Sequence, residues 1–285
     1  MKSPVTPQKI MMALKELASE KTGSSINELR LILALERAVA RMENHKKLSN
    51  HFVFKGGFVL LKTINTSRFT RDVDALALGL SRKKVPSLVI EALENDLNDG
   101  FWFGDVETED LTDQGPYGGY RFTAAFQIGK PSSLVTAKIK RLSRIHIDVG
   151  FGDPVEELTK KQTMPSILEG EKTVTWSVYP FEYIFAEKLE ALFSRGSANS
   201  RAKDIYDMPL IFKKCASLAK LRRAIKRTFE NRQTPIPSSF LKTAEGFDLS
   251  IMKRAWPSVE FLVESVSFQE SWKSLLGILK KIDSN

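Results

Sequence analysis

The order of the hydrophobic patterns along the chain constrains its fold more than any other feature. The N-terminal part follows a helical period, and the stretch INELRLILALERAVARME is apolar on more than one face, which is typical of a buried helix. Strand-like patterns follow, and from Pro180 onward the chain is again helical, with a loop at residues 235–239. This order predicts an α+β fold, with domains at 1–170 and 171–285.

The middle of the chain carries the strand predictions. RDVDALAL, YRFTAAFQIG and KIKRLSRIHIDVGFG are predicted strands, and residues 85–99 are a predicted helix. In the last strand, isoleucine and valine alternate with His146 and Asp148, so the apolar side chains face a core and the polar ones face the other way. The acidic residues 105–113 form a turn-rich stretch between these elements.

Composition narrows the class of protein. Cys215 is the only cysteine, so an internal disulfide is impossible and a reducing compartment is expected. The sequence shows no secretory signal and no apolar run of about 20 residues, which predicts a cytoplasmic protein without a membrane partner. The net charge of +9 favours a polyanionic partner such as nucleic acid, with simple solubility as the alternative.

Asp72 and Asp74 are the first candidate metal ligands. Residues two apart in a strand point to the same face, so these carboxylates would stand side by side. Their repulsion is costly unless a cation lies between them, and hard oxygen ligands on a rigid strand suit Mg²⁺. Taken alone, such a pair is more often two solvated aspartates in a loop, and the surrounding sequence decides between the two interpretations.

The flanking segments favour the metal interpretation. Gly56 and Gly57 follow Lys55, and two glycines let backbone N–H groups approach a phosphate closely, although a plain turn uses the same residues. Asp148 lies on the polar face of a later strand. It would be a third ligand or the base for an attacking hydroxyl, with an ordinary half-exposed strand residue as the alternative.

Two helical segments add a lysine and two aspartates. Lys188 lies on the apolar stripe of PFEYIFAEKLEALF, so it either extends to the helix edge or reaches into a pocket that holds phosphates. In RAKDIYDM, Asp204 and Asp207 would face a common site, unless Asp207 pairs with Lys203 on its own helix. Pro209 is expected to end or kink this helix.

Taken in order, these segments resemble a known enzyme family. KGGFVLL, RFTRDVDAL, IHIDVGFG, AEKLEALFSR and RAKDIYDM are similar to the motifs of AbiEii-type nucleotidyltransferase toxins, relatives of the MenT toxins in the DNA polymerase beta-like nucleotidyltransferase superfamily. The resemblance runs from about Phe52 to Met208. It implies a mixed sheet core flanked by helices, with a helical C-terminal part. Gly57 replaces a serine that the superfamily often has, so phosphate contact would come from backbone N–H groups.

The resemblance also implies an activity. Asp72, Asp74 and Asp148 would bind Mg²⁺ against a nucleoside triphosphate, and a nucleoside monophosphate would pass to an acceptor hydroxyl as pyrophosphate leaves. Lys188 would act with them by neutralising the charge that develops on the leaving group. The implied nucleotide-binding residues are Lys55, Gly56, Gly57, Arg71, Lys188, Asp204 and Asp207. Arg68, like Arg71, would touch phosphates or be a surface charge.

The acceptor is inferred from the basic residues and the family together. Basic residues cluster in TAKIKRLSRIH and in KKCASLAKLRRAIKRTFENR, where either a nucleic-acid backbone or solvent would face them. MenT-like relatives modify the acceptor end of tRNA. The resemblance therefore implies the toxin of a type IV toxin–antitoxin system, with a cognate antitoxin, that modifies RNA and first of all the tRNA 3′ end. The alternatives are transfer to a small molecule or a protein side chain, and an inactive scaffold that binds nucleic acid.

Overall fold

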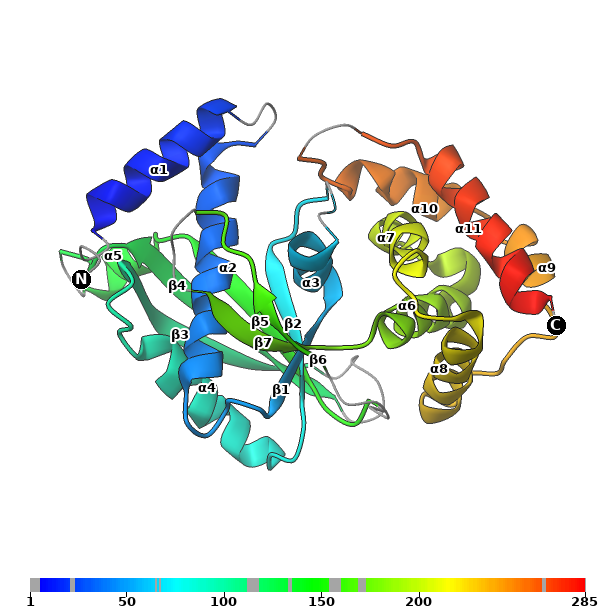
Figure 1. The fold of residues 1–285 in the computed structure, drawn as a ribbon, viewed down its shortest axis with the longest axis horizontal. Coiled ribbons are helices and arrows are strands. Elements are labelled where there is room, and N and C mark those ends of the chain that lie inside the picture. Colours follow the sequence, from blue (N-terminus) through cyan, green and yellow to red (C-terminus); the bar gives the residue numbers. More distant parts are fainter. Residues whose placement is uncertain are drawn as a thin grey trace. The chain divides into compact units, whose positions relative to one another are not determined.

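The chain folds into two compact units in the computed structural model (Figure 1). The described residues are 6–20, 24–64, 66, 68–111, 118–132, 135–153, 160–168, 173–262 and 265–284. The first unit, which we call the sheet unit, comprises the described residues up to Lys62 together with Thr70–Gly152 and Lys160–Val178. The second, the helical unit, comprises the described residues of Thr63–Phe69, Asp153 and Tyr179 onward.

The sheet unit contains a seven-stranded sheet. Its strands are β1 (Phe52–Lys55), β2 (Asp72–Ala77), β3 (Phe101–Leu111), β4 (Gly119–Ile128), β5 (Arg144–Gly150), β6 (Lys160–Met164) and β7 (Val174–Val178). Its helices are α1 (Pro7–Glu20), α2 (Ile26–Asn44), α3 (Gly56–Thr63), η1 (Arg82–Lys84), α4 (Val85–Glu94) and α5 (Thr136–Ile139).

The helical unit consists of helices throughout its described elements. They are α6 (Phe181–Arg195), η2 (Gly196–Ala198), α7 (Ala202–Phe212), α8 (Leu218–Asn231), α9 (Phe240–Glu245), α10 (Ser250–Ala255), η3 (Trp256–Ser258) and α11 (Phe268–Asp283). Helix α6 packs against α7 and α8, and α11 packs against α7 and α9. Every described helix, in either unit, is too short or too polar to cross a membrane.

The sheet is mixed and has the strand order β3-β4-β5-β2-β1-β7-β6. Strand β2 runs parallel to β5, and β1 runs parallel to β7, whereas the other neighbours are antiparallel. A mixed sheet with helices and a helical C-terminal part confirms the predicted α+β class. The last crossing between the two units lies between residues 178 and 179, after β7, and the sequence predicts a boundary near residue 170.

Helix α2 forms much of the core beneath the sheet, as its all-round apolar sequence predicts. It lies across one face of the sheet, where it contacts β5 and β7 (Figure 1). The helix starts at a capping box, in which the Ser25 hydroxyl accepts from the Glu28 N–H and the Glu28 carboxylate accepts from the Ser25 N–H. Nearly all of its residues from Leu29 to Met42 are buried.

Two local predictions were wrong, and of the two alternatives for Pro209 the structure excludes the end of the helix. The acidic stretch after Phe101 is strand β3, whose register shifts between Gly104 and Glu107 and so hides the strand period. The strand predicted from KIKR starts only at Arg144, and α5 precedes it. Helix α7 continues past Pro209 to Phe212, because its packing against α6 and α11 outweighs the lost hydrogen bond.

Candidate active site

The three acidic candidates of the sheet unit lie on neighbouring parallel strands. Asp72 and Asp74 are on β2, and the register places Asp74 directly beside Asp148 of β5. Neighbouring strands are about 4.8 Å apart, and residues in register share a face of the sheet. The structure therefore brings the carboxylates of Asp72, Asp74 and Asp148 to one face of the sheet.

These carboxylates are part of a row of charged residues that crosses the sheet. We call the following set the charged row: Glu109 of β3, Arg121 of β4, Asp148 of β5, Asp74 of β2 and Lys55 of β1. Each member is the register partner of the next. Asp72 lies two residues from Asp74 on the same face and accepts a hydrogen bond of 2.7 Å from the Thr70 hydroxyl.

Gly56 fixes where the Asp74 carboxylate lies. Its φ is +73°, and a Cβ built on it would come within 1.8 Å of Asp74 Oδ2. Both the backbone conformation and the close approach therefore require glycine. Gly56 and Gly57 open helix α3, whose first backbone N–H groups have no partner within the helix itself, so the positive end of the helix dipole lies beside this carboxylate. Arg71, just before β2, is exposed.

Arg121 is a member of this site that sequence reasoning missed. Its guanidinium forms a bidentate ion pair with the Asp148 carboxylate. Nε donates to Oδ1 at 2.8 Å, and Nη2 donates to Oδ2 at 2.7 Å. The hydrogen bond to Asp148 is the main cause that raises the pKa of Arg121, and the charges of Asp72 and Glu109 add to it. The alternation of Arg121 and Thr123 with apolar residues in YRFTAAFQIG was the available signal.

The donor chemistry of this face fits a divalent metal ion. Carboxylate oxygens on a rigid strand are the ligands that Mg²⁺ prefers. No three His, Cys, Asp or Glu side chains of the described residues are grouped tightly enough to hold a metal. The pairing of Asp148 with Arg121 is consistent with this result, because it turns the third carboxylate toward a guanidinium.

The other predicted residues come together inside the helical unit. Lys188 Nζ donates to Asp204 Oδ1 at 2.6 Å and to Asp207 Oδ2 at 2.9 Å. Arg68 makes a two-armed pair with Asp207, and Arg201 Nε donates to Asp204 at 2.6 Å. We call these five residues the Lys188 network. Arg68 is buried in it rather than at the surface, and Asp207 pairs with Arg68 and Lys188.

Electrostatics keep the Lys188 network ionised despite its burial. Burial alone would raise the pKa of the Asp204 carboxyl, but the charges of Lys188 and Arg201 outweigh it and hold that pKa well below its usual range. The pKa of Asp207 is lowered in the same way, against burial, by Lys188 and Arg68. Burial opposes the positive charge on Lys188, yet the two aspartates raise its pKa.

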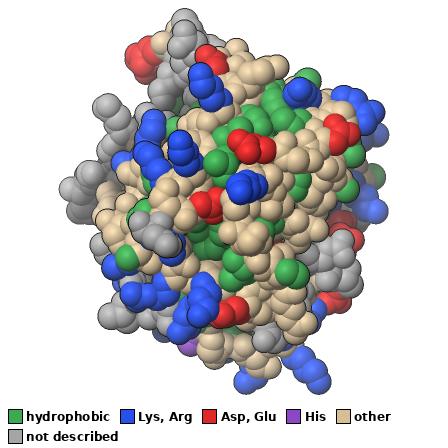
Figure 2. Space-filling model, turned by 90° about the vertical axis from the view of Figure 1, so that its right-hand side faces the viewer, with side chains coloured by type: hydrophobic (Ala, Val, Ile, Leu, Met, Phe, Trp, Pro, Cys, Tyr) green, Lys and Arg blue, Asp and Glu red, His purple; other side chains and the backbone are tan. Residues whose placement is uncertain are grey.

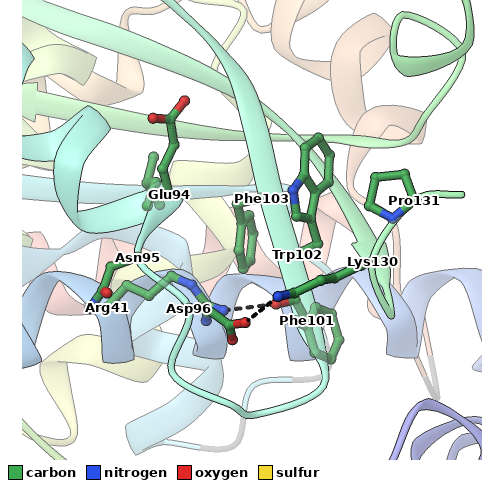
Figure 3. A pocket seen from close by; sticks show the side chains of 10 residues that line it. Arg41, Glu94, Asn95, Asp96, Phe101, Trp102, Phe103, Lys130 and Pro131 are labelled. Atoms are coloured by element: carbon green, nitrogen blue, oxygen red, sulfur yellow. Dashed lines mark hydrogen bonds and ion pairs between the residues drawn. The ribbon is translucent and has the colours of Figure 1, made fainter. Parts of the chain in front are cut away.

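A cavity of about 290 Å³ lies elsewhere in the sheet unit (Figure 3). It is lined by Arg41, Leu93, Glu94, Asn95, Asp96, Phe101, Trp102, Phe103, Lys130 and Pro131. The Arg41 guanidinium inside it is already bound to Asp99 at 2.7 Å and lies over the Phe103 ring. No predicted site residue lines this cavity, and its buried charge is compensated within the fold.

The two basic segments are only partly available to a partner. Arg144 is bound to Asp105, and Arg222 donates to the carbonyls of Lys281 and Ile282 at the end of α11. The exposed basic residues are Lys138, Lys140 and Arg141 in the first segment and Lys213, Lys214, Lys220, Arg223, Lys226 and Arg227 in the second. On the face drawn in Figure 2, basic side chains form several groups with acidic ones between them.

The chain is similar to known proteins along most of its length. The family described as "Nucleotidyl transferase AbiEii toxin, Type IV TA system" matches residues 37–275. No curated protein matches in sequence. A solved putative nucleotidyltransferase from Helicobacter pylori is 17% identical, with a TM-score of 0.54 and coverage of 91% of this chain and 96% of that one.

Two further solved structures have the same fold. JHP933 from Helicobacter pylori is 16% identical, with a TM-score of 0.53 over 91% of this chain and 93% of its own. MenT4, the nucleotidyltransferase toxin Rv2826c from Mycobacterium tuberculosis H37Rv, is 17% identical, with a TM-score of 0.51 over 96% of this chain and 99% of its own.

Proposed function

The chain belongs to the AbiEii family of nucleotidyltransferase toxins, and from this premise we propose that it transfers a nucleoside monophosphate to RNA in a Mg²⁺-dependent reaction. A toxin of this family implies a nucleoside triphosphate substrate and a cognate antitoxin. The observation that carries the proposal is the set of carboxylates on β2 and β5 beside the glycine-led start of α3.

Each residue of the sheet unit has a proposed role that follows from its position. Asp72 and Asp74 hold the metal, and Asp148 is the third ligand or the base that accepts the proton of the attacking hydroxyl. When bound, Mg²⁺ supplies the positive charge that offsets the charge developing on the phosphates. Backbone N–H groups of Gly56 and Gly57 receive the phosphates at the start of α3.

The other roles that the family resemblance implies belong to the same proposal. Lys55 and Arg71 add positive charge beside the carboxylates for the triphosphate. Lys188, Asp204 and Asp207 contribute to nucleotide binding by the family's pattern. Their compensated charges in the helical unit make the Lys188 network a rigid support, because each aspartate oxygen in it is fixed by a named cation.

An RNA acceptor, with the tRNA 3′ end as first candidate, is supported by charge and by family resemblance. The protein carries a net charge of +9, and nucleic-acid backbones are bound mainly through lysine and arginine. The exposed basic residues of α8 and of the loop before it offer such contacts. The type IV toxin–antitoxin assignment follows the family and is part of the same proposal.

Label transfer tests the proposal. Purified protein is incubated with Mg²⁺, each α-labelled nucleoside triphosphate in turn and total cellular RNA. The wild type is compared with Asp74→Asn and with Asp110→Asn, a matched control whose exposed carboxylate pairs with Arg82 on the surface. We expect label in a tRNA-sized band for the wild type and the control, and none for folded Asp74→Asn.

Each other outcome has a defined meaning. Label in the Asp74→Asn lane would overturn the assignment of the site. Label that appears only in protein or in small molecules would overturn the RNA acceptor while keeping the enzyme class. If the tRNA label is lost when the 3′-terminal nucleotides are removed from the labelled product, the acceptor is the tRNA 3′ end.

A further inference from the structure

Arg121 occupies a position that the proposed reaction leaves unexplained. It is the register neighbour of Asp148, and its guanidinium donates hydrogen bonds to both oxygens of that carboxylate. The Asp148 side chain is 5% exposed, whereas 39% of the Arg121 side chain remains exposed. A buried carboxylate is therefore held by a cation that itself reaches solvent.

The pairing changes the charge that a metal ion would meet. Asp72, Asp74 and Asp148 without Arg121 would place three negative charges on one face of the sheet, and such crowding is costly. With Arg121 the group carries two negative charges, which a divalent cation balances. Arg121 therefore offsets part of this negative charge, and a metal ion that bound Asp148 would have to displace the guanidinium.

A guanidinium fork suits phosphate as well as carboxylate. Each presents two oxygens that accept two parallel N–H hydrogen bonds from arginine. Lysine cannot supply this bidentate geometry. An arginine released from Asp148 beside a triphosphate would thus exchange one two-armed pair for another. The exposed part of the Arg121 side chain makes this exchange possible without unfolding of β4.

We propose that Arg121 is a positioning residue that holds Asp148 in the nucleotide-free enzyme and turns to the triphosphate when metal and nucleotide bind together. The inference rests on the proposed function, because it assumes that Asp72, Asp74 and Asp148 form the metal site. Its consequence is ordered loading: metal alone binds weakly, since it must compete with Arg121, and binds tightly only with the nucleotide.

Mn²⁺ titration followed by electron paramagnetic resonance tests the inference without any turnover. Nucleotide-free wild type is compared with Arg121→Gln, and with Arg82→Gln as a matched arginine of the same unit that pairs with Asp110 at the surface. We expect Arg121→Gln to bind Mn²⁺ about tenfold more tightly than the wild type. Arg82→Gln should match the wild type.

Nucleotide affinity is the second measurement, made with a non-hydrolysable α,β-methylene triphosphate and Mg²⁺. Arg121→Gln should bind it about tenfold more weakly, because the fork that receives the phosphate is gone. Arg121→Lys keeps the charge but not the fork, so it should fall between the two. A role confined to holding β4 and β5 together would not move the two affinities in opposite directions.

The outcomes separate this inference from the function on which it rests. Equal or weaker Mn²⁺ binding by folded Arg121→Gln and by Arg121→Lys, with label transfer to RNA intact in the wild type, would overturn the role of Arg121 alone. Tighter Mn²⁺ binding that disappears in Arg121→Gln/Asp74→Asn would support it. No Mn²⁺ binding by any variant, and no transfer, would remove the proposed function and the inference with it.

Discussion

At the scale of single residues, Gly56 positions the Asp74 carboxylate by having no side chain. We predict that Gly56→Ala destabilises the fold by about 1–2 kcal/mol through backbone strain, and more if Asp74 cannot move aside. Transfer activity should be lost with it, because the displaced carboxylate is a proposed metal ligand. Urea unfolding gives the stability, and label transfer gives the activity.

Gly277 of α11 provides the matched control for that substitution. A Cβ added there meets no atom within 4 Å, and alanine is the better helix former by about 1 kcal/mol. Gly277→Ala should therefore raise stability and leave transfer unchanged. A Gly56→Ala protein that behaves like Gly277→Ala would show that Gly56 has no role in placing Asp74.

Glu43, near the end of α2, links stability to pH. Burial raises its pKa to about 7, although Lys161 and the Ser177 backbone oppose the shift. An acid with a raised pKa in the folded state contributes stability at low pH, and this contribution is lost as the pH rises through about 7. We predict that the free energy of unfolding falls more between pH 5 and pH 8 in the wild type than in Glu43→Gln. Parallel pH profiles for the two proteins would contradict this.

The shared face of Asp72 and Asp74 was predictable at this scale, but the arginine beside Asp148 was not. Asp72 and Asp74 share a face because of the strand period alone, so local sequence is sufficient. Arg121 is opposite Asp148 only because β4 and β5 pair in one particular register, across 27 residues of chain. A shift of one residue would point Arg121 to the other face, and no local pattern excludes that shift.

At the scale of helices and strands, the Lys188 network joins α6 to α7. We predict that Lys188→Met destabilises the protein by about 3–5 kcal/mol, because it leaves two buried carboxylates without their shared cation. Lys203→Met on α7 removes an exposed lysine and should change stability by less than about 0.5 kcal/mol. Chemical unfolding of both variants measures the difference, and equal effects would contradict the structural role.

Lys188 also shows how far helical periodicity can be used. The stripe in α6 predicts that Lys188 faces the core, and the structure confirms that it is buried. The period could not name its partners, because they lie on the next helix and at Arg68, far away in sequence. For the same reason the tolerance of α7 for Pro209 could not be foreseen, since it depends on packing rather than on propensity.

At the scale of the whole molecule, the positive charge predicts salt-dependent binding. If about four lysines or arginines contact RNA phosphates, log K should fall with log salt with a slope of about −3. Fluorescence anisotropy with labelled tRNA at several KCl concentrations measures the slope. Lys220→Glu/Arg223→Glu on α8 should weaken binding, whereas Lys15→Glu on α1 should have little effect. Binding that is independent of salt would count against an RNA substrate.

The acidic strand β3 has a consequence for how the molecule meets its neighbours. It stands at the border of the sheet, so one side of its backbone has no strand partner within the described sheet. Glu107, Glu109 and Asp110 are exposed along it. An extended segment of another molecule that docked there would bring its backbone against these charges, and charged borders of this kind discourage aggregation. The stretch that resembles a loop in sequence thus discourages edge-to-edge pairing of this sheet with other molecules.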